Sequence, residues 1–241
     1  DNGTLLSEIY NHMAKEHRNE YFYLNTLFNK LLCGQYRSNT TTALTQIPIR
    51  RSKADLILIS GHAVVYEIKT ELDTFNRLDT QLRNYYCAFS HVCVVTSESQ
   101  YERAAQILAG SPVGIYVLTQ QNTISTSLRK EPQADTTRLE HTAVFKVLRK
   151  HEYERILLLH DGSLPVATPA FYYGECLKRF SRMPVLEAYE MAIWQLRQRN
   201  RMTLKEFEKV PTELKSLIYF AQPSKADLQA INMFLNKQYP G

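Results

Sequence analysis

The stretch Lys53-Ala-Asp-Leu-Ile-Leu-Ile-Ser-Gly-His-Ala-Val-Val-Tyr-Glu-Ile-Lys69 decides the fold of this chain. Two runs rich in aliphatic and β-branched residues flank Gly61-His62, and this pattern predicts a β-hairpin. Glycine at the first central position favours a two-residue type II′ turn. Folding of the hairpin carries Asp55, near the start of the first strand, towards the end of the second strand.

Charged side chains gather at that end of the hairpin. Glu67 and Lys69 are two residues apart, so they project from one face of their strand. Together with Asp55 they bring two carboxylates and an ammonium together, and the carbonyl of Ile68 adds a further oxygen. Carboxylate and carbonyl oxygens are ligands that Mg²⁺ prefers. We therefore expect a metal bound by Asp55, Glu67 and Ile68. The alternative is a surface hairpin with an ordinary Glu-x-Lys ion pair.

The chemistry expected of this cluster is hydrolysis of a phosphodiester bond. A divalent metal offsets the negative charge that develops on a transferred phosphoryl group. A lysine beside it orients the attacking water or neutralises charge. Asp55, Glu67 and Lys69 are therefore the predicted catalytic residues.

A helix is predicted directly after this hairpin. Between Asn76 and Phe89 the apolar residues have helical spacing. Gln81 and Tyr85 are four residues apart and therefore share one face of that helix. A competing interpretation makes Tyr85 a core residue and Gln81 a solvated one.

Asp55, Glu67-Ile-Lys69 and Gln81-x-x-x-Tyr85 together resemble the PD-(D/E)xK nuclease superfamily, and more narrowly its RecB-type branch. The resemblance covers about residues 16 to 118. It implies a metal-dependent nuclease that uses Mg²⁺, or Mn²⁺ in its place, with Gln81 and Tyr85 contacting nucleic acid. DNA is the expected substrate, and RNA stays open. One departure from the family pattern is that Lys53-Ala54, and not a proline, precedes Asp55.

In many such nucleases the first helix carries another metal-ligating glutamate. Glu8, Glu16 and Glu20 are the candidates, and Glu20 is chosen because it opens the more apolar half of its predicted helix. A solvated glutamate is the alternative. Asp73 and Asp79 are interpreted as a helix N-terminal and a surface acid, not as ligands.

The expected order of elements is that of the superfamily core, αβββαβ. Residues 5–33 are predicted as one helix, and Ile47-Pro-Ile49 as a short edge segment. The hairpin, the helix at 76–89 and a buried strand at 91–96 follow. A helix at 99–109 and a strand at 113–118 complete a central mixed sheet.

We expect a PD-(D/E)xK-like core at residues 1–128 and a mainly helical accessory region at 129–241. Gln120–Ser127 is expected to add an edge strand. Helices are predicted at 137–150, 153–160, 169–182, 184–199, 212–221 and 225–239. Thr203–Glu206 and Ser224–Asp227 have the pattern of a helix N-terminal capping box. The helical region could shape a nucleic-acid groove or be a scaffold with ordinary charged faces.

The charge suits a polyanionic partner without requiring one. The 241 residues include 29 Lys and Arg against 24 Asp and Glu, a formal net charge of +5. Arg51, just before the site, and Arg77, on the motif helix, are the predicted phosphate contacts. Solvated surface charges are the alternative for both.

The cysteines and the hydropathy of the sequence indicate in which cellular compartment the protein is expected. The four cysteines show no Cys-x-x-Cys spacing, which favours reduced thiols in a cytoplasmic protein. No apolar stretch approaches the roughly 18 residues of a membrane span, so no membrane association is expected. Because the chain starts at Asp1 without Met, an earlier targeting segment stays open. A protein partner or a second copy also stays open.

Three classes of function fit these observations. The first is a metal-dependent deoxyribonuclease. The second is a non-catalytic nucleic-acid-binding or interaction module that has kept the fold. The third is an RNA-directed, toxin or phage-defence component, which residue types around the site do not separate from a repair enzyme.

Overall fold

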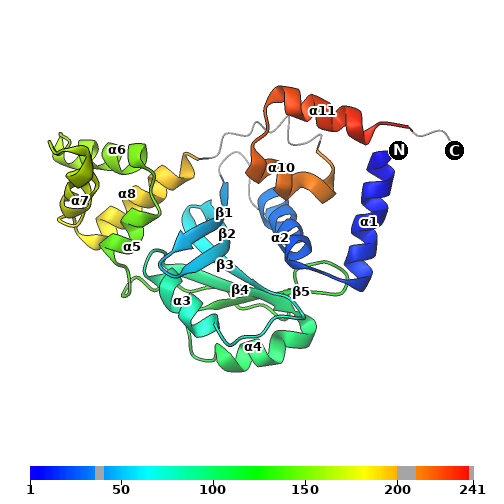
Figure 1. The fold of residues 1–241 in the computed structure, drawn as a ribbon. Helices are drawn as coiled ribbons and strands as arrows, with labels where there is room; N and C mark the ends of the chain where they lie inside the picture. Colours follow the sequence, from blue (N-terminus) through cyan, green and yellow to red (C-terminus); the bar gives the residue numbers. More distant parts are fainter. Residues whose placement is uncertain (36–40, 200–209, 239–241) are drawn as a thin grey trace.

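A five-stranded mixed sheet lies at the centre of the computed structural model, which describes residues 1–35, 41–199 and 210–238 (Figure 1). The strand order is β1-β2-β3-β4-β5. The antiparallel strands are β1 (Thr42–Ile49), β2 (Ser52–Ser60) and β3 (His62–Lys69). Strands β4 (His91–Ser97) and β5 (Gly114–Leu118) run parallel to β3. The predicted α/β class with a mixed sheet is therefore confirmed.

The helices cover both faces of this sheet. Those that precede or connect the strands are α1 (Asn2–Glu16), α2 (Glu20–Phe28), the π-helix η1 (Asn29–Gln35), α3 (Leu78–Tyr86), the 3₁₀ turn η2 (Glu98–Gln100) and α4 (Tyr101–Ile107). Those that follow are α5 (His141–Lys146), α6 (Lys150–Asp161), α7 (Pro169–Phe180), α8 (Val185–Arg197), the 3₁₀ turn η3 (Thr212–Leu214), α10 (Lys215–Ala221) and α11 (Lys225–Leu235).

Two hydrophobic cores lie on opposite faces of the sheet. Leu56 and Leu58 of β2 pack with α2 and η1 in one core. Ile57 and Ile59 pack with α3 and α4 in the other. This alternation of side chains along β2 is the one expected for a strand buried on both faces.

The single helix predicted at residues 5–33 is wrong, because the chain breaks between α1 and α2. The side chain of Asn19 accepts a hydrogen bond from the backbone N–H of Phe22 at 3.0 Å and so caps the start of α2. Arg18 forms an ion pair with Glu71 and donates a hydrogen bond to the Thr119 carbonyl at 2.7 Å. These contacts tie the break to the sheet and make Glu20 the first residue of α2.

The hairpin is present, but its turn is not the predicted two-residue type. Ser60 is in register with His62, so Gly61 alone stands at the apex, with φ of 80°. That left-handed conformation carries no steric penalty for glycine. Because this register pairs Ile57 with Val65, it also decides which side chains of β3 share a face with Ile57.

The edge segment at Ile47–Ile49 is confirmed and extends back to Thr42, since β1 is the edge strand of the sheet. The edge strand expected at residues 120–127 is wrong. That segment forms turns and one isolated bridge between Leu118 and Ile124. Asn122, with φ of 57°, lies in a turn closed by a hydrogen bond from the Thr119 N–H to the Thr123 carbonyl, so the chain folds back too tightly for a strand.

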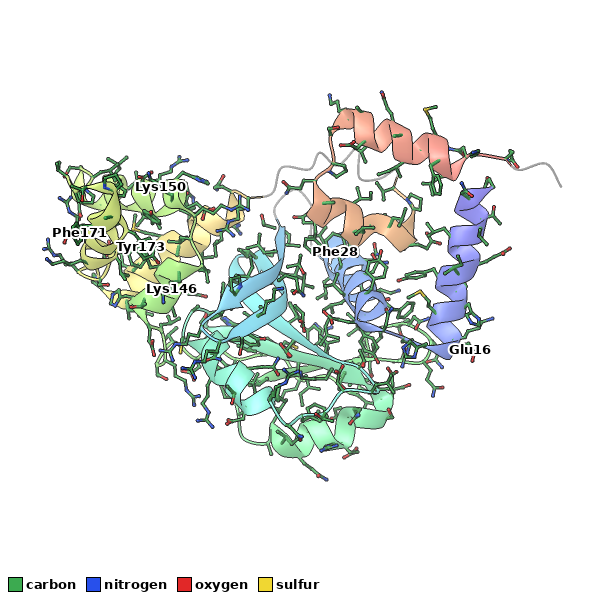
Figure 2. All side chains as sticks on the ribbon, in the orientation of Figure 1. Glu16, Phe28, Lys146, Lys150, Phe171 and Tyr173 are labelled. Atoms are coloured by element: carbon green, nitrogen blue, oxygen red, sulfur yellow. The ribbon has the colours of Figure 1, made fainter. Side chains whose placement is uncertain are left out.

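The described residues after 129 are mainly helical, as predicted, and their helices lie in two groups (Figure 1). Helices α5 to α8 extend the core on the α3 side of the sheet. Helices α10 and α11 pack instead near α2 and α1 (Figure 1). Figure 2 shows Phe28 at the contact of α2 with α10, where its ring packs against Tyr219 and Phe220.

Of the two predicted capping boxes, the one at Ser224–Asp227 is confirmed at the start of α11. The one at residues 203–206 lies outside the described residues. In the segments 1–35, 41–199 and 210–238, no helix is long and apolar enough to span a membrane.

Candidate active site

The register of the hairpin directs Glu67 and Lys69 towards α3. Val65 and its partner Ile57 both pack in the core on the α3 side. Glu67 and Lys69 follow Val65 by two and four residues and therefore project from the same face. Their side chains are only 2% and 8% exposed. The predicted pair is therefore inside the protein, and the surface ion-pair interpretation is wrong.

Each carboxylate oxygen of Glu67 has a hydrogen-bond partner. The Lys69 Nζ donates to Glu67 Oε1 at 2.7 Å, and the Gln81 Nε2 donates to the same oxygen. The Tyr85 hydroxyl donates to Oε2. Lys69 also donates to Gln81 Oε1 at 3.1 Å. A buried charge requires such pairing, and the four side chains form one network.

Asp55 lies where strands β2 and β3 separate. The paired ladder between them ends at Leu56 and Tyr66. Beyond this last pair, the backbone N–H of Ile68 donates to Asp55 Oδ2 at 2.8 Å. The carboxylate therefore takes the place of a strand carbonyl and lies between the two strands, close to Glu67.

The neighbouring strand β1 is distorted at the same level of the sheet. Gln46 has φ of 56° and lies between the register pairs Thr45–Leu56 and Ile47–Ala54, across from Asp55. The Thr45 hydroxyl donates to the Asp55 carbonyl at 2.6 Å. Left-handed conformations of residues other than glycine are costly and occur often at functional sites. Thr45 and Gln46 are site residues that the sequence does not reveal.

The carboxyl of Asp55 is crowded by negative charge. Burial, and next the charge of Glu67, raise the pKa of Asp55 to about 7, against the opposing effect of the Ile68 N–H and the Lys69 ammonium. Among the described residues, Asp55 Oδ1 accepts no hydrogen bond. Two carboxylates and the nearby Ile68 carbonyl are hard oxygen donors, and a cation between them would relieve their repulsion. The donor set therefore fits Mg²⁺ or Mn²⁺.

Glu20 lies at the margin of this cluster. It is exposed at the start of α2, and its negative charge also contributes to raising the pKa of Asp55. Within the described ranges, no three His, Cys, Asp or Glu side chains are gathered as a metal-holding group. The ligand role of Glu20 stays a prediction.

The raised pKa of Asp55 gives an expected pH dependence of stability in metal-free buffer. The folded state holds this proton more tightly than the unfolded state, so the contribution to stability is complete below about pH 4 and is lost as pH rises through 7. The difference between the folded-state and unfolded-state pKa of Asp55 limits this contribution to the unfolding free energy to about 4 kcal/mol. We expect Asp55→Asn to remove this loss, raising the unfolding free energy at pH 8 and leaving it unchanged at pH 4. Urea unfolding in EDTA measures the unfolding free energy at both pH values. If it depended on pH in the same way in the wild type and in Asp55→Asn, the carboxyl of Asp55 would not be crowded by negative charge.

Helix α3 carries the predicted Gln81 and Tyr85 to the carboxylates. The Asn84 side chain donates to Ser52 Oγ at 2.8 Å and ties α3 to the start of β2. Tyr85 is completely buried, and its hydroxyl, which donates to Glu67, also lies 3.0 Å from the Lys53 carbonyl oxygen. It is thus a core residue and a site residue at once. The interpretation of Gln81 as a solvated side chain is wrong, whereas contact of either residue with nucleic acid stays a prediction.

The two adjacent tyrosines of α3 provide a matched test of this geometry. Unlike that of Tyr85, the buried Tyr86 hydroxyl has no hydrogen-bond partner in the described part of the chain. Tyr85→Phe leaves a buried carboxylate oxygen of Glu67 without its donor, so we expect a loss of about 1–3 kcal/mol in unfolding free energy. Tyr86→Phe is expected to be neutral or slightly stabilising. Equal effects of the two substitutions in urea unfolding would contradict the Tyr85–Glu67 hydrogen bond.

The predicted phosphate contacts lie on the surface around the site. Arg51, in the β1–β2 turn, and Arg77, which precedes α3, are exposed and form no ion pair with any described residue. By contrast, Arg83 pairs with Asp79. The interpretation of Asp79 as a surface acid is therefore confirmed. Asp73 accepts hydrogen bonds from the N–H and hydroxyl of Thr70, both at 2.8 Å, which stabilises the turn after β3.

The chain belongs to the family described as bacteriophage P4 protein cII, whose model matches residues 13–227. No curated protein matches it. One similar solved structure is a protein of unknown function from Silicibacter pomeroyi, which is 14% identical and covers 60% of this chain and 93% of its own, with a TM-score of 0.38. A likeness this low supports no conclusion about fold or function. The functional argument therefore rests on the geometry of the Asp55–Glu67–Lys69 cluster.

Proposed function

We propose that this protein is a metal-dependent nuclease that hydrolyses phosphodiester bonds, with DNA as its substrate. The observation that carries the proposal is the convergence of Asp55 and Glu67 with Lys69 where β2 and β3 separate. Burial, and next the like charge of Glu67, raise the pKa of Asp55, an arrangement that favours a bound cation. Perturbed acidic groups with a specific charge partner are frequent at active sites.

Each residue of the cluster has a definable part in such a reaction. Asp55, Glu67 and the Ile68 carbonyl would hold a divalent cation, which when bound supplies charge stabilisation to the phosphoryl group. The Lys69 ammonium is held at 2.7 Å from Glu67 and would orient the attacking water and donate to a phosphoryl oxygen. Gln81 and Tyr85 hold Glu67 in place, so that its carboxylate is oriented before substrate binds.

A non-catalytic binding module is the competing interpretation. Phosphate binding alone is achieved by exposed lysine and arginine, and it gives no reason to bury a carboxylate, an ammonium and their hydrogen-bond partners together. Such burial is costly. The 2% exposure of the Glu67 side chain therefore favours the catalytic interpretation.

A substrate panel tests the proposal. Purified protein is incubated with linear duplex, circular duplex and single-stranded DNA, and with RNA, each in Mg²⁺, Mn²⁺ or EDTA. The proposal expects cleavage of at least one DNA substrate with metal and none in EDTA. Cleavage of RNA alone would correct the substrate class. Cleavage that persists in EDTA would refute the metal dependence.

A further inference from the structure

A polar pocket lies along the edge strand β1. It has a volume of about 410 Å³ and is bounded by β1, the start of α6, the end of α8 and α10. Its walls include Thr45, Arg149, Arg155, Gln195, Arg199 and Phe220. Thr45 connects the pocket with the candidate active site, because its hydroxyl donates to the Asp55 carbonyl at 2.6 Å.

The pocket carries an excess of positive charge. Its one described carboxylate, Glu152, is buried and is satisfied by Arg199, which donates to its two oxygens at 2.7 and 2.6 Å. The backbone N–H of Arg149 also donates to Glu152, at 2.6 Å. Within the described part of the chain, neither the Arg149 nor the Arg155 side chain has a carboxylate in ion-pair distance. Two arginine charges therefore remain for a ligand.

A buried donor without a described partner lies at the wall of the same pocket. Gln195 is 3% exposed and lines the pocket, and its Nε2 has no hydrogen-bond partner among the residues that the structure describes. A buried amide N–H that lacks an acceptor is destabilising by roughly 1–3 kcal/mol, and native proteins leave few such groups. An oxygen of a bound ligand would satisfy it.

We propose that this pocket binds a phosphate group. Arginines present paired N–H donors that match phosphate oxygens. Gln195 Nε2 supplies a neutral donor, and the half-buried Phe220 offers aromatic surface for a base.

The source of the phosphate is a nucleic-acid strand or a free nucleotide. The strand follows from the proposed function, since Thr45 lies between the pocket and Asp55, and a strand seated here would continue towards the cleavage site. Phosphate binding itself does not depend on the proposed function, because the pocket contains none of Asp55, Glu67 and Lys69.

Two substitutions in the pocket and one matched control distinguish binding in the pocket from non-specific attraction to the positive charge of the protein. Gln195→Met removes the unpaired donor at similar volume and is expected to leave thermal stability unchanged or higher. Arg155→Ala removes an exposed charge beside Trp194. The control Arg182→Ala removes an exposed arginine that precedes α8, whereas Gln195 lies ten residues into that helix, about 15 Å further on.

Binding is measured in EDTA, where no metal-dependent cleavage occurs. One arm uses a fluorescein-labelled 12-nucleotide single-stranded DNA in anisotropy titrations, and the other uses dAMP in calorimetry. We expect Gln195→Met and Arg155→Ala each to lower the affinity for at least one of the two ligands about tenfold or more. Arg182→Ala is expected to leave the affinity for both ligands within about twofold of the wild type.

The arm that responds identifies the source of the phosphate. If all three variants bind both ligands as the wild type does, or if the wild type binds neither, the pocket assignment is overturned. Wild-type DNA cleavage with unchanged binding in the variants would overturn the pocket alone. Intact pocket binding without any metal-dependent cleavage would instead count against the proposed function.

Discussion

Asp55→Asn and Glu67→Gln are each expected to lower the rate of phosphodiester cleavage by about 10³-fold or more. Each change removes a negative charge that holds the cation, and the charge stabilisation lost in the transition state amounts to several kcal/mol. Both substitutions preserve shape. Asn at position 55 still accepts from the Ile68 N–H, and Gln at position 67 still accepts from Lys69. The rate is measured on the best substrate of the panel.

The control for this pair is Asp79→Asn, on the exposed face of α3. Asp79 pairs only with the exposed Arg83 among the described residues, so the same change of charge close to the site is expected to leave cleavage within about twofold. Activity retained in Asp55→Asn or Glu67→Gln, or lost equally in the control, would contradict the assignment of catalysis to this cluster.

Replacement of Lys69 is expected to have the second largest effect. Lys69→Met should reduce the rate by about 10²-fold or more, the scale seen when a transition-state donor is removed, while affinity for DNA stays within a few-fold. The buried Glu67 then loses its ion-pair partner, so folding is checked by circular dichroism. Lys69→Gln, which can keep a neutral donor to Glu67, separates the chemical effect from misfolding.

The comparison of rate with binding decides the role of Lys69. A rate that falls while binding persists identifies a catalytic group. A proportional fall of both would identify a phosphate anchor, and the catalytic assignment of Lys69 would then be wrong.

The parts of the site that could be predicted are those set by local periodicity. The two-residue spacing of Glu67 and Lys69 in a strand, and the four-residue spacing of Gln81 and Tyr85 in a helix, each place two side chains on one face. The hydrogen bonds of Gln81 and Tyr85 with Glu67 join the two patterns. The buried strands β4 and β5 were also predictable from a local pattern, because continuous apolar runs indicate strands covered on both faces.

The parts that could not be predicted depend on tertiary contacts. The helical pattern of residues 5–33 continues through the break at residues 17–19, which is stabilised by the contacts of Arg18 with Glu71 and Thr119. The left-handed conformation of Gln46 has no local sequence signal. Gln195 is an ordinary polar residue in the pattern of its helix, and only the packing of α6 and β1 beside α8 brings it to the wall of a pocket. In each case the deciding partner lies far along the chain.

The central claim, a divalent-cation site at Asp55 and Glu67, is tested most directly by calorimetric titration of Mn²⁺ into the wild type, Asp55→Asn and Glu67→Gln. This measurement needs no nucleic acid, so it detects the metal site even if the protein cleaves only a specific sequence that the substrate panel lacks. We expect saturable binding to the wild type, at least tenfold weaker in both variants and unchanged in Asp79→Asn. No binding to the wild type, or equal binding to all four proteins, would contradict the claim.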